Sequence, residues 1–375
     1  MKITDIKVNQ LKGVEGSDAQ RYPGAVSGRL IVRVFTDEGV TGIAEGSRHL
    51  GVFRAYLDDV IKPLIIGMSP VQPRRIWEAL ALGVGERATR LPSQIVGAID
   101  VACWDITGKV AGLPIYALLG GAHRTEIPLY WSRGNGWSKT PAQMLEEVQE
   151  GYEKGYRAFK VRMDWKDYRQ DSDPAKDLAI FQACREWLPD DVPLSFDANN
   201  GYSVPTAIEQ GRRFEQLGIA HFEEPLPQYD LRGLRQVVDA LDCAVSTGEQ
   251  ELSAWRFRDL MDLANPDILQ PDILNVGGLS EVVRVNEMAV ANNKILMPHS
   301  PNIGANSLAS LHAYCTVTNA VRPNEFSEEF TGPAERVAEL FVDPILPQNG
   351  SIKLTDRPGL GVELNEKALE KAILS

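Results

Sequence analysis

Acidic residues recur at a constant interval in the middle of the chain, each at the end of a short apolar run. Asp197, Glu223 and Glu249 fall in the runs PLSFDANN, IAHFEEP and AVSTGEQ, and are 26 and then 26 residues apart. One strand and one returning helix need about this many residues, so the three carboxylates are expected to meet at one rim of a parallel barrel. Asp272 lies 23 residues further on and His299 another 27, which continues the rhythm.

The residue types at these positions indicate chemistry. Three carboxylates supply hard oxygen ligands, which suit Mg²⁺ far better than zinc or copper. An Asp and a His at the same spacing add a pair that can hold and move a proton. The pattern therefore predicts a metal site with catalytic groups beside it.

Strand-like and helix-like stretches alternate from about residue 127 onward. Helix starts are readable at Thr140-Pro141, Asp173-Pro174 and Ser203. The alternation predicts a (β/α)8-type barrel, and a doubly wound open sheet is weaker because no G-x-G-x-x-G follows the first strand. The predicted strands are IPLYWS, YRAFKVR, PLSFDAN, AHFEEP, CAVSTGE, DILQPD, KILMPHS and NEFSEE.

The two ends of the chain have a different pattern. MKITDIKVNQLK, GRLIVRVFTDEG and VTGIAEG alternate apolar and polar residues, as a three-stranded antiparallel sheet does, and a long helix follows up to Gly112-Leu113-Pro114. After residue 338 the alternation of strand and helix is lost. We therefore expect an α+β capping domain over 1–125, a barrel over 126–338, and a segment over 339–375 that returns to the cap.

Composition restricts the partners. The chain has 375 residues and a net charge of −12 with no basic block, which argues against nucleic acid and anionic membranes as partners. No apolar run approaches the ~20 residues that a membrane span needs. The four cysteines are scattered without a C-x-x-C pair and are expected to be buried thiols of a reducing compartment. A cytoplasmic protein is expected.

Alternation along the strands groups further side chains with the acidic ones. Lys160 and Arg162 share one face of their strand, and Asn199 shares the face of Asp197. His221 lies on the same side as Glu223 if that strand is regular, although structural packing is the more common role for such a histidine.

Several short motifs, in this order and spacing, resemble the mandelate racemase-like subgroup of the enolase superfamily over nearly the whole chain. They are AIDVACWDITGKVAGLPIYALLGG at 98–121, FKVR, SFDANNGY, FEEP, TGE, QPDILNVGG and PHSPN. The resemblance implies a modified TIM barrel of the (β/α)7β type, with an α+β capping domain that the C-terminal segment completes. It also implies Mg²⁺-assisted removal of the proton α to a carboxylate, giving an enediolate.

The resemblance assigns roles residue by residue. Asp197, Glu223 and Glu249 would be the Mg²⁺ ligands. His299 would be the base or acid on one face of the substrate, with Asp272 fixing its tautomer. Asn199 would be a polar contact near the metal and a candidate for substrate binding.

One further acidic residue of the family hydrogen-bonds the substrate carboxylate. Glu328 would take this role, and Glu325 and Glu329 remain alternatives because the EFSEE stretch leaves the register open.

The chain departs from the family pattern on the second barrel strand. The subgroup often has Lys-x-Lys there, whereas this chain has Lys160-Val161-Arg162. Arginine stays protonated and is a poor general base, so a racemase with two bases is disfavoured. Lys160 is expected to stabilise enolate charge, and Arg162 could bind a carboxylate or hydroxyl.

Two N-terminal loops, at about 13–28 and 46–54, would cover the barrel mouth in this family. Arg21, Tyr22 and His49 could contact substrate hydroxyls there, and this polar lining favours an acid sugar.

The expected function is therefore a hydro-lyase, an acid-sugar dehydratase that forms a 2-keto-3-deoxy acid, assembled as a homo-oligomer as family members commonly are. A racemase or epimerase, a sugar-lactone cycloisomerase and, more remotely, a non-catalytic sugar-acid binding protein are the alternatives.

Overall fold

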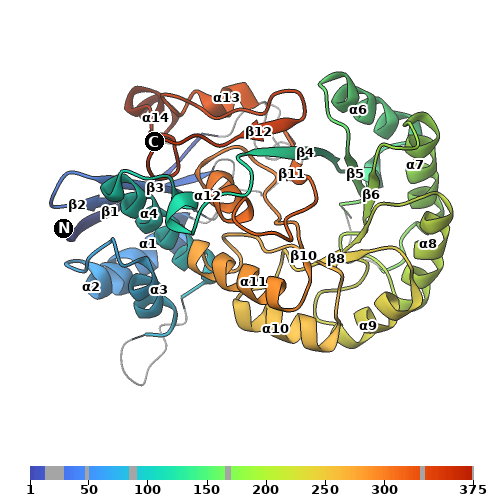
Figure 1. The fold of residues 1–375 in the computed structure, drawn as a ribbon, viewed down its shortest axis with the longest axis horizontal. Coiled ribbons are helices and arrows are strands. Elements are labelled where there is room, and N and C mark those ends of the chain that lie inside the picture. Colours follow the sequence, from blue (N-terminus) through green and yellow to red (C-terminus); the bar gives the residue numbers. More distant parts are fainter. Residues whose placement is uncertain (13–28, 47–49, 84–90, 165–169, 330–333, 374–375) are drawn as a thin grey trace.

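The computed structural model describes residues 1–12, 29–46, 50–83, 91–164, 170–329 and 334–373. The chain begins with an antiparallel sheet in the order β1-β2-β3, with bounds Ile3–Gln10, Leu30–Thr36 and Thr41–Gly46. This antiparallel order confirms the predicted meander (Figure 1), and the apolar side chains of the strands are buried.

The cap helices cover this sheet. They are α1 (Leu50–Tyr56), which continues through a π-helical turn at Leu57–Ile61 into α2 (Lys62–Ile65), then α3 (Pro73–Ala81), α4 (Ser93–Ala111) and α5 (Ile115–Leu118). Gly112 ends α4 in the left-handed conformation, with φ 67°, as its position in the sequence predicts. Gly42 of β3 lies so close to α4 that a Cβ there would be 2.0 Å from the carbonyl oxygen of Ala102. The sheet and α4 therefore pack in direct backbone contact.

The barrel consists of eight parallel strands alternating with seven helices in the described part of the chain (Figure 1). The strands are β4 (Glu126–Arg133), β5 (Phe159–Arg162), β6 (Leu194–Asp197), β7 (Phe222–Glu223), β8 (Val245–Thr247), β9 (Ile268–Leu269), β10 (Ile295–Leu296) and β11 (Asn324–Phe326). The helices are α6 (Pro141–Glu153), α7 (Pro174–Trp187), α8 (Val204–Gln216), α9 (Leu231–Ala240), α10 (Ala254–Leu263), α11 (Leu279–Ala291) and α12 (Ala305–Tyr314).

The predicted (β/α)7β fold is thus confirmed, with strands shorter than the apolar runs that predicted them. The strands pair in the order β10-β9-β8-β7-β6-β5-β4-β11. Between β10 and β11 the contact consists of single backbone hydrogen bonds, Leu296 N–H to the Asn319 carbonyl (3.3 Å) and Ser327 N–H to the Pro301 carbonyl (2.7 Å).

All three predicted helix starts are confirmed, and two of them have a side-chain cap. Thr140 forms a capping box with Gln143 at the start of α6, and Asp173 accepts the backbone N–H of Lys176 in α7. Ser203 precedes α8 without capping it through its side chain, because its hydroxyl bonds the Thr206 hydroxyl instead (3.1 Å).

The C-terminal segment contacts both parts of the molecule. β12 (Ser351–Lys353) pairs antiparallel with β4 at the base of the barrel, after α13 (Ala334–Ala338). α14 (Glu366–Ala372) lies beside the cap, where Leu11 and Ile373 form a β-bridge (Figure 1).

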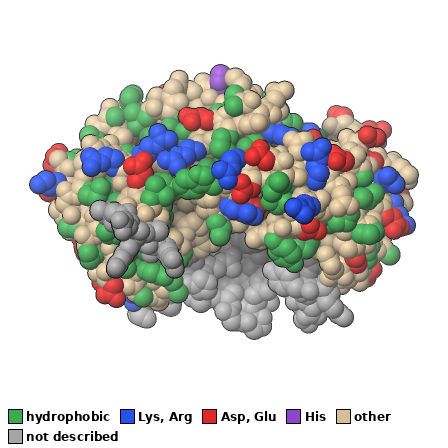
Figure 2. All heavy atoms as spheres, turned by 90° about the horizontal axis from the view of Figure 1, so that it is seen from below, with side chains coloured by type: hydrophobic (Ala, Val, Ile, Leu, Met, Phe, Trp, Pro, Cys, Tyr) green, Lys and Arg blue, Asp and Glu red, His purple; other side chains and the backbone are tan. Residues whose placement is uncertain are grey.

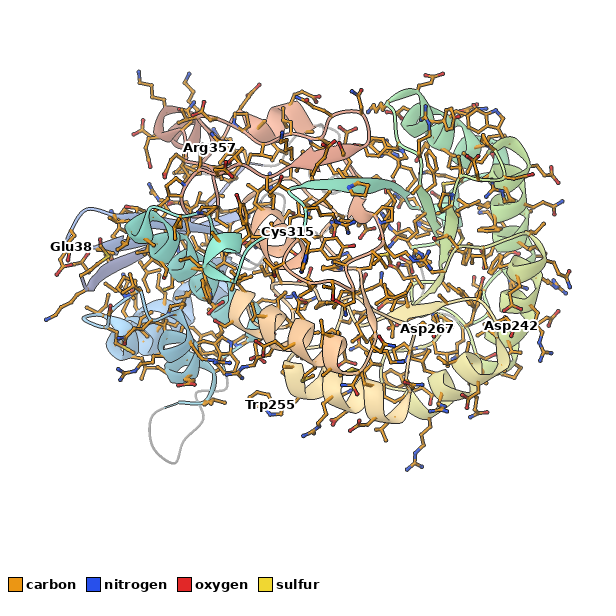
Figure 3. The ribbon with its side chains drawn as sticks, in the orientation of Figure 1. Glu38, Asp242, Trp255, Asp267, Cys315 and Arg357 are labelled. Atoms are coloured by element: carbon orange, nitrogen blue, oxygen red, sulfur yellow. The ribbon has the colours of Figure 1, made fainter. Side chains whose placement is uncertain are left out.

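The four cysteines are free thiols; three are buried and Cys243 is half-buried. Cys315 follows α12 directly and lies in the interior between cap and barrel (Figure 3). Within the described ranges, every helix is too short or too polar to cross a membrane.

Candidate active site

The predicted site residues gather at the carboxyl ends of the barrel strands. Lys160 and Arg162 come from β5, Asp197 ends β6 and Glu223 ends β7. The parallel register sets Arg162 beside Asp197 and Asp197 beside Glu223. These four side chains are almost completely buried, so their charges depend on one another rather than on water.

Lys160 is the cation at the centre of this group. Its Nζ forms an ion pair with Glu223 Oε1, lies 3.0 Å from Glu325 Oε1 and 3.5 Å from Asp197 Oδ2. Although burial alone would lower the pKa of Lys160, the carboxylates of Glu223 and Glu325 raise it well above its usual value. Lys160 is therefore a fixed positive charge and a poor proton acceptor.

His299 and Asp272 form a hydrogen-bonded pair across the barrel from Lys160. His299 Nδ1 is 2.9 Å from Asp272 Oδ2, while the other Asp272 oxygen accepts the backbone N–H groups of Leu274 and Asn275. His299 Nε2 points into the site, 3.5 Å from Glu249 Oε2 and 3.7 Å from Glu325 Oε2.

The charge of His299 follows from these neighbours. Burial opposes protonation, but Glu249 and the hydrogen bond to Asp272 raise the pKa of His299 to about 10. Metal-free protein therefore holds this ring as an imidazolium at neutral pH.

The three predicted metal ligands each have a protein cation beside them. Lys160 contacts Asp197 and Glu223, and His299 lies against Glu249. In the described part of the chain, no three His, Cys, Asp or Glu side chains converge into a ready-made metal-binding group.

The chemistry of the three carboxylates nevertheless fits Mg²⁺. All their donors are oxygen atoms. Burial together with the charge of Glu223 raises the pKa of Asp197 well above its usual value, and burial raises that of Glu249. A divalent cation would relieve this repulsion.

Arg162 is held by protein partners on three sides. Its guanidinium donates to Asp164 Oδ1 (3.1 Å), to the Ser132 hydroxyl (3.1 Å) and to Glu329 Oε2 (2.8 Å). A Cβ on Gly134 would lie 2.4 Å from the Arg162 Nη2, so this close packing requires glycine there. The structure therefore pairs Arg162 with carboxylates of the protein.

The structure separates the three candidate glutamates of the EFSEE stretch. Glu325, on β11, faces the barrel interior between Lys160 and His299, and its Oε2 has no hydrogen-bond partner within the described residues. Glu329 pairs with Arg162. Glu328 lies away from the site, where its Oε2 pairs with Lys154 of the outer helix layer (2.8 Å). Glu325 therefore occupies the position that Glu328 was expected to fill.

Asn199 contacts the first predicted ligand. Its backbone N–H donates to Asp197 Oδ1 (2.7 Å), and its side-chain oxygen accepts the backbone N–H of Asp164 (2.8 Å).

Sequence reasoning did not single out Gln270, which donates to Glu223 Oε2 (2.8 Å). The one signal for it was its position two residues before Asp272, which places both on the inner face of one extended segment.

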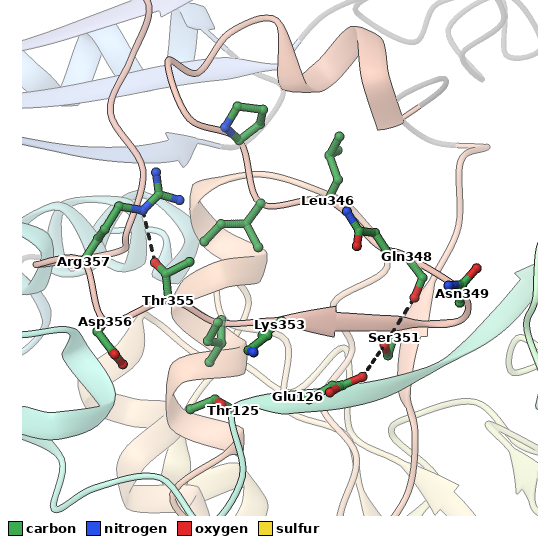
Figure 4. A pocket seen from close by; sticks show the side chains of 13 residues that line it. Thr125, Glu126, Leu346, Gln348, Asn349, Ser351, Lys353, Thr355, Asp356 and Arg357 are labelled. Atoms are coloured by element: carbon green, nitrogen blue, oxygen red, sulfur yellow. Dashed lines mark hydrogen bonds between the residues drawn. The ribbon is translucent and has the colours of Figure 1, made fainter.

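Three predicted substrate-binding residues, Arg21, Tyr22 and His49, lie outside the described residues. A surface cavity of about 960 Å³ lies at the other end of the barrel, between the start of β4 and the C-terminal segment (Figure 4). Its polar groups bond to one another, as Ser351 does to Glu126 (3.0 Å), and it shares no residue with the site.

Comparison with known proteins identifies the family. Residues 143–368 match the enolase C-terminal domain-like family, and residues 26–120 match the N-terminal domain of mandelate racemase and muconate lactonizing enzyme. The chain belongs to the enolase superfamily, in the mandelate racemase and muconate lactonizing enzyme subgroup, as the motifs predict.

Characterised relatives span most of the chain. An arabinonate dehydratase of Saccharolobus solfataricus is 27% identical over 98% of both chains. The L-talarate/galactarate dehydratase of Salmonella typhimurium is 32% identical over 80% of this chain and 69% of its own length. The D-galactarolactone cycloisomerase of Agrobacterium fabrum is 29% identical over 91% and 90%.

A solved structure is equally similar. A mandelate racemase/muconate lactonizing protein from Paracoccus denitrificans, crystallised with magnesium, superposes with a TM-score of 0.87 at 30% identity, covering 99% of this chain and 96% of its own.

Proposed function

We propose that this enzyme is an Mg²⁺-dependent acid-sugar dehydratase that converts an aldonate or aldarate to a 2-keto-3-deoxy acid. The observation that carries the proposal is the contrast between the two sides of the site. His299, bonded to Asp272 at 2.9 Å, presents Nε2 to the interior, where the nearest carboxylate oxygens are 3.5 and 3.7 Å away, whereas Lys160 and Arg162 are both held in close ion pairs. Such a site has one group suited to proton transfer.

Dehydration can proceed with one such group. Neutral His299 takes the proton from the carbon α to the carboxylate, and the electron pair of that bond becomes the enediolate. The pair then forms the bond between the α and β carbons as the β-hydroxyl leaves. His299 returns the proton to this leaving group, so water and the enol of the keto acid are formed and the enol ketonises.

The charged side chains around His299 each have a role in this scheme. Asp272 holds Nδ1 so that Nε2 is the atom that exchanges the proton. Lys160 places a fixed positive charge where the substrate carboxylate gains negative charge. Glu325, whose Oε2 has no hydrogen-bond partner within the described residues, can accept a hydrogen bond from a substrate hydroxyl or a protonated carboxylate oxygen.

Mg²⁺ fits this scheme as the resident cofactor. Asp197, Glu223 and Glu249 would hold it, and when bound it would supply positive charge to the carboxylate oxygens of the substrate. The same cation would reduce the effect of Glu249 on His299, which favours the neutral imidazole that the first step requires.

The relatives support an acid sugar as the substrate, but they do not distinguish dehydration from cycloisomerisation. Two of those described above are named as dehydratases of such acids, and one as a cycloisomerase. Racemisation would require a second base, which the ion pairs of Lys160 and Arg162 disfavour. A non-catalytic binding protein would have no need of the His299–Asp272 pair.

Proton NMR in D₂O with Mg²⁺ and pools of aldonates and aldarates tests the proposal. A new deoxy-methylene signal together with a keto acid is expected. Exchange of the α-proton without loss of water would instead indicate a racemase or epimerase, and ring closure or opening of a lactone a cycloisomerase. No reaction with any member of either class would remove the acid-sugar assignment.

We also propose that the protein assembles as a homo-oligomer and that it is located in the cytoplasm. The molecular face in Figure 2 carries Lys and Arg side chains interspersed with Asp and Glu. Light scattering of the purified protein measures the first, and fractionation of the source cells the second.

A further inference from the structure

A buried hydrogen-bonded chain lies beneath Glu223, on the inner face of the barrel. Ser195 of β6 and His221, just before β7, are neighbours because Phe196 pairs with Phe222 in the parallel register. The Ser195 Oγ is 2.7 Å from His221 Nδ1, and His221 Nε2 is 3.3 Å from Glu223 Oε2. All three residues are buried.

The direction of these hydrogen bonds follows from Glu223. An ionised carboxylate can only accept, so the hydrogen between it and the ring must be carried by His221 Nε2. A neutral ring then has a lone pair on Nδ1, and the Ser195 hydroxyl donates to it. Ser195 thus stabilises the tautomer of His221 that carries its hydrogen on Nε2, where it can be donated to Glu223.

The two oxygens of Glu223 have different surroundings. Oε2 accepts from His221 and from Gln270 (2.8 Å), both on the floor of the site. Oε1 faces Lys160, whose Nζ also contacts Asp197. The donors on Oε2 therefore fix the carboxylate so that Oε1 is the oxygen on the side of Asp197.

We propose that His221, held by Ser195, is a positioning residue for metal binding, which keeps Glu223 Oε2 engaged so that Oε1 is presented to a divalent cation. This inference rests on the proposed assignment of Glu223 as a metal ligand. From the sequence alone, His221 is expected to have only a packing role, whereas the proposal assigns it a role in metal binding. Groups that orient a ligand in this way typically change metal affinity 10–100-fold when removed.

The test measures Mn²⁺ binding to protein stripped with EDTA, by EPR detection of the free ion, and needs no substrate. His221→Leu removes the donor, Ser195→Ala removes the group that fixes the tautomer, and His221→Gln keeps an amide N–H near the position of Nε2. Ser246→Ala is the matched control, because Ser246 lies beside Glu223 on β8 and its buried hydroxyl has no hydrogen-bond partner in the described structure.

The expected result is a loss of Mn²⁺ affinity of at least about tenfold for His221→Leu, a smaller loss for Ser195→Ala and partial recovery for His221→Gln. Ser246→Ala should bind as the unmodified protein does. Melting temperatures of the metal-free variants establish that each is folded.

Two results would overturn the inference in distinguishable ways. Folded His221→Leu that binds Mn²⁺ as tightly as the unmodified protein removes the positioning role and leaves the proposed function intact. Failure of the unmodified protein to bind Mn²⁺ at all removes the metal site itself. If His221→Leu does not fold, Ser195→Ala and Ser246→Ala decide, since equal affinities of these two variants would refute the inference.

Discussion

Replacing Glu249 by Gln should change the proton affinity of His299 in the metal-free enzyme. Glu249 Oε2 lies 3.5 Å from His299 Nε2. Two unit charges at this distance interact by about 5 kcal/mol at an effective dielectric constant of 20. The imidazole is 23% and the carboxylate 18% exposed, so we discount this for solvent screening to about 2 kcal/mol. Each 1.36 kcal/mol corresponds to about tenfold in proton affinity, so Glu249→Gln should lower the pKa of His299 from about 10.

The sign of the stability effect follows from the same shift. The folded-state pKa of His299 is raised above its ordinary 6.5 to about 10. Protonated His299 therefore stabilises the metal-free fold fully below the lower value, and this contribution is lost as pH rises through the upper one. In Glu249→Gln the loss should still begin near 6.5, but it should be smaller and complete at a lower pH, because only the folded-state pKa falls.

The pH dependence of His299 carbethoxylation, followed by mass spectrometry of its peptide, measures the change. The chain has five histidines, so the site of modification is readily assigned. Glu251→Gln is the control, because Glu251 pairs with Arg256 (3.0 Å). Identical His299 profiles in Glu249→Gln and the unmodified protein would refute the electrostatic reasoning. Calorimetry on the same variant should show weaker Mg²⁺ binding, and unchanged affinity would remove Glu249 from the ligand set.

Three further changes test other parts of the molecule. His299→Asn should abolish α-proton exchange while Mg²⁺ binding persists, and exchange at the original rate would exclude His299 as the base. Gly304→Ala should lower the melting temperature by about 1–4 °C, since a Cβ there, at φ +152°, would lie 2.4 Å from Glu45 Oε1 and cost about 1–3 kcal/mol. Arg162→Met should cost up to about 3 kcal/mol of unfolding free energy, because buried Glu329 loses the guanidinium and keeps Lys139 (3.6 Å) as a charged neighbour. Adding Glu329→Gln should recover part of that loss in urea titrations, whereas simple additivity would contradict the pairing.

Much of the fold could be predicted from the sequence, because its signals are periodic. A strand and its returning helix recur at about 26 residues, and the carboxyl ends of parallel strands share one rim. The spacing alone therefore predicts that Asp197 and Glu223 lie together, and the Asp272–His299 contact follows from the same rhythm. No comparable periodic pattern in the sequence predicts that the strands are short or that the contact between β10 and β11 is weak.

The roles within the EFSEE stretch show what local pattern cannot decide. Glu325, Glu328 and Glu329 have similar sequence surroundings, yet one faces His299, one pairs with Lys154 and one with Arg162. Strand β11 ends at Phe326, so alternation no longer applies to the last two.

Sequence by itself determined the class of fold, the rim on which the candidate catalytic residues lie, and the carboxylates and histidine on it. Only the tertiary structure decided which partner each charge has: Lys160 with Glu223, Arg162 with Glu329, and Ser195 with His221 beneath the site. The physical reason is that period and residue type are local properties, whereas pairing across strands depends on the register of a closed barrel. That register depends on contacts between segments far apart in the chain, such as Gly134 and Glu329, which are 195 residues apart.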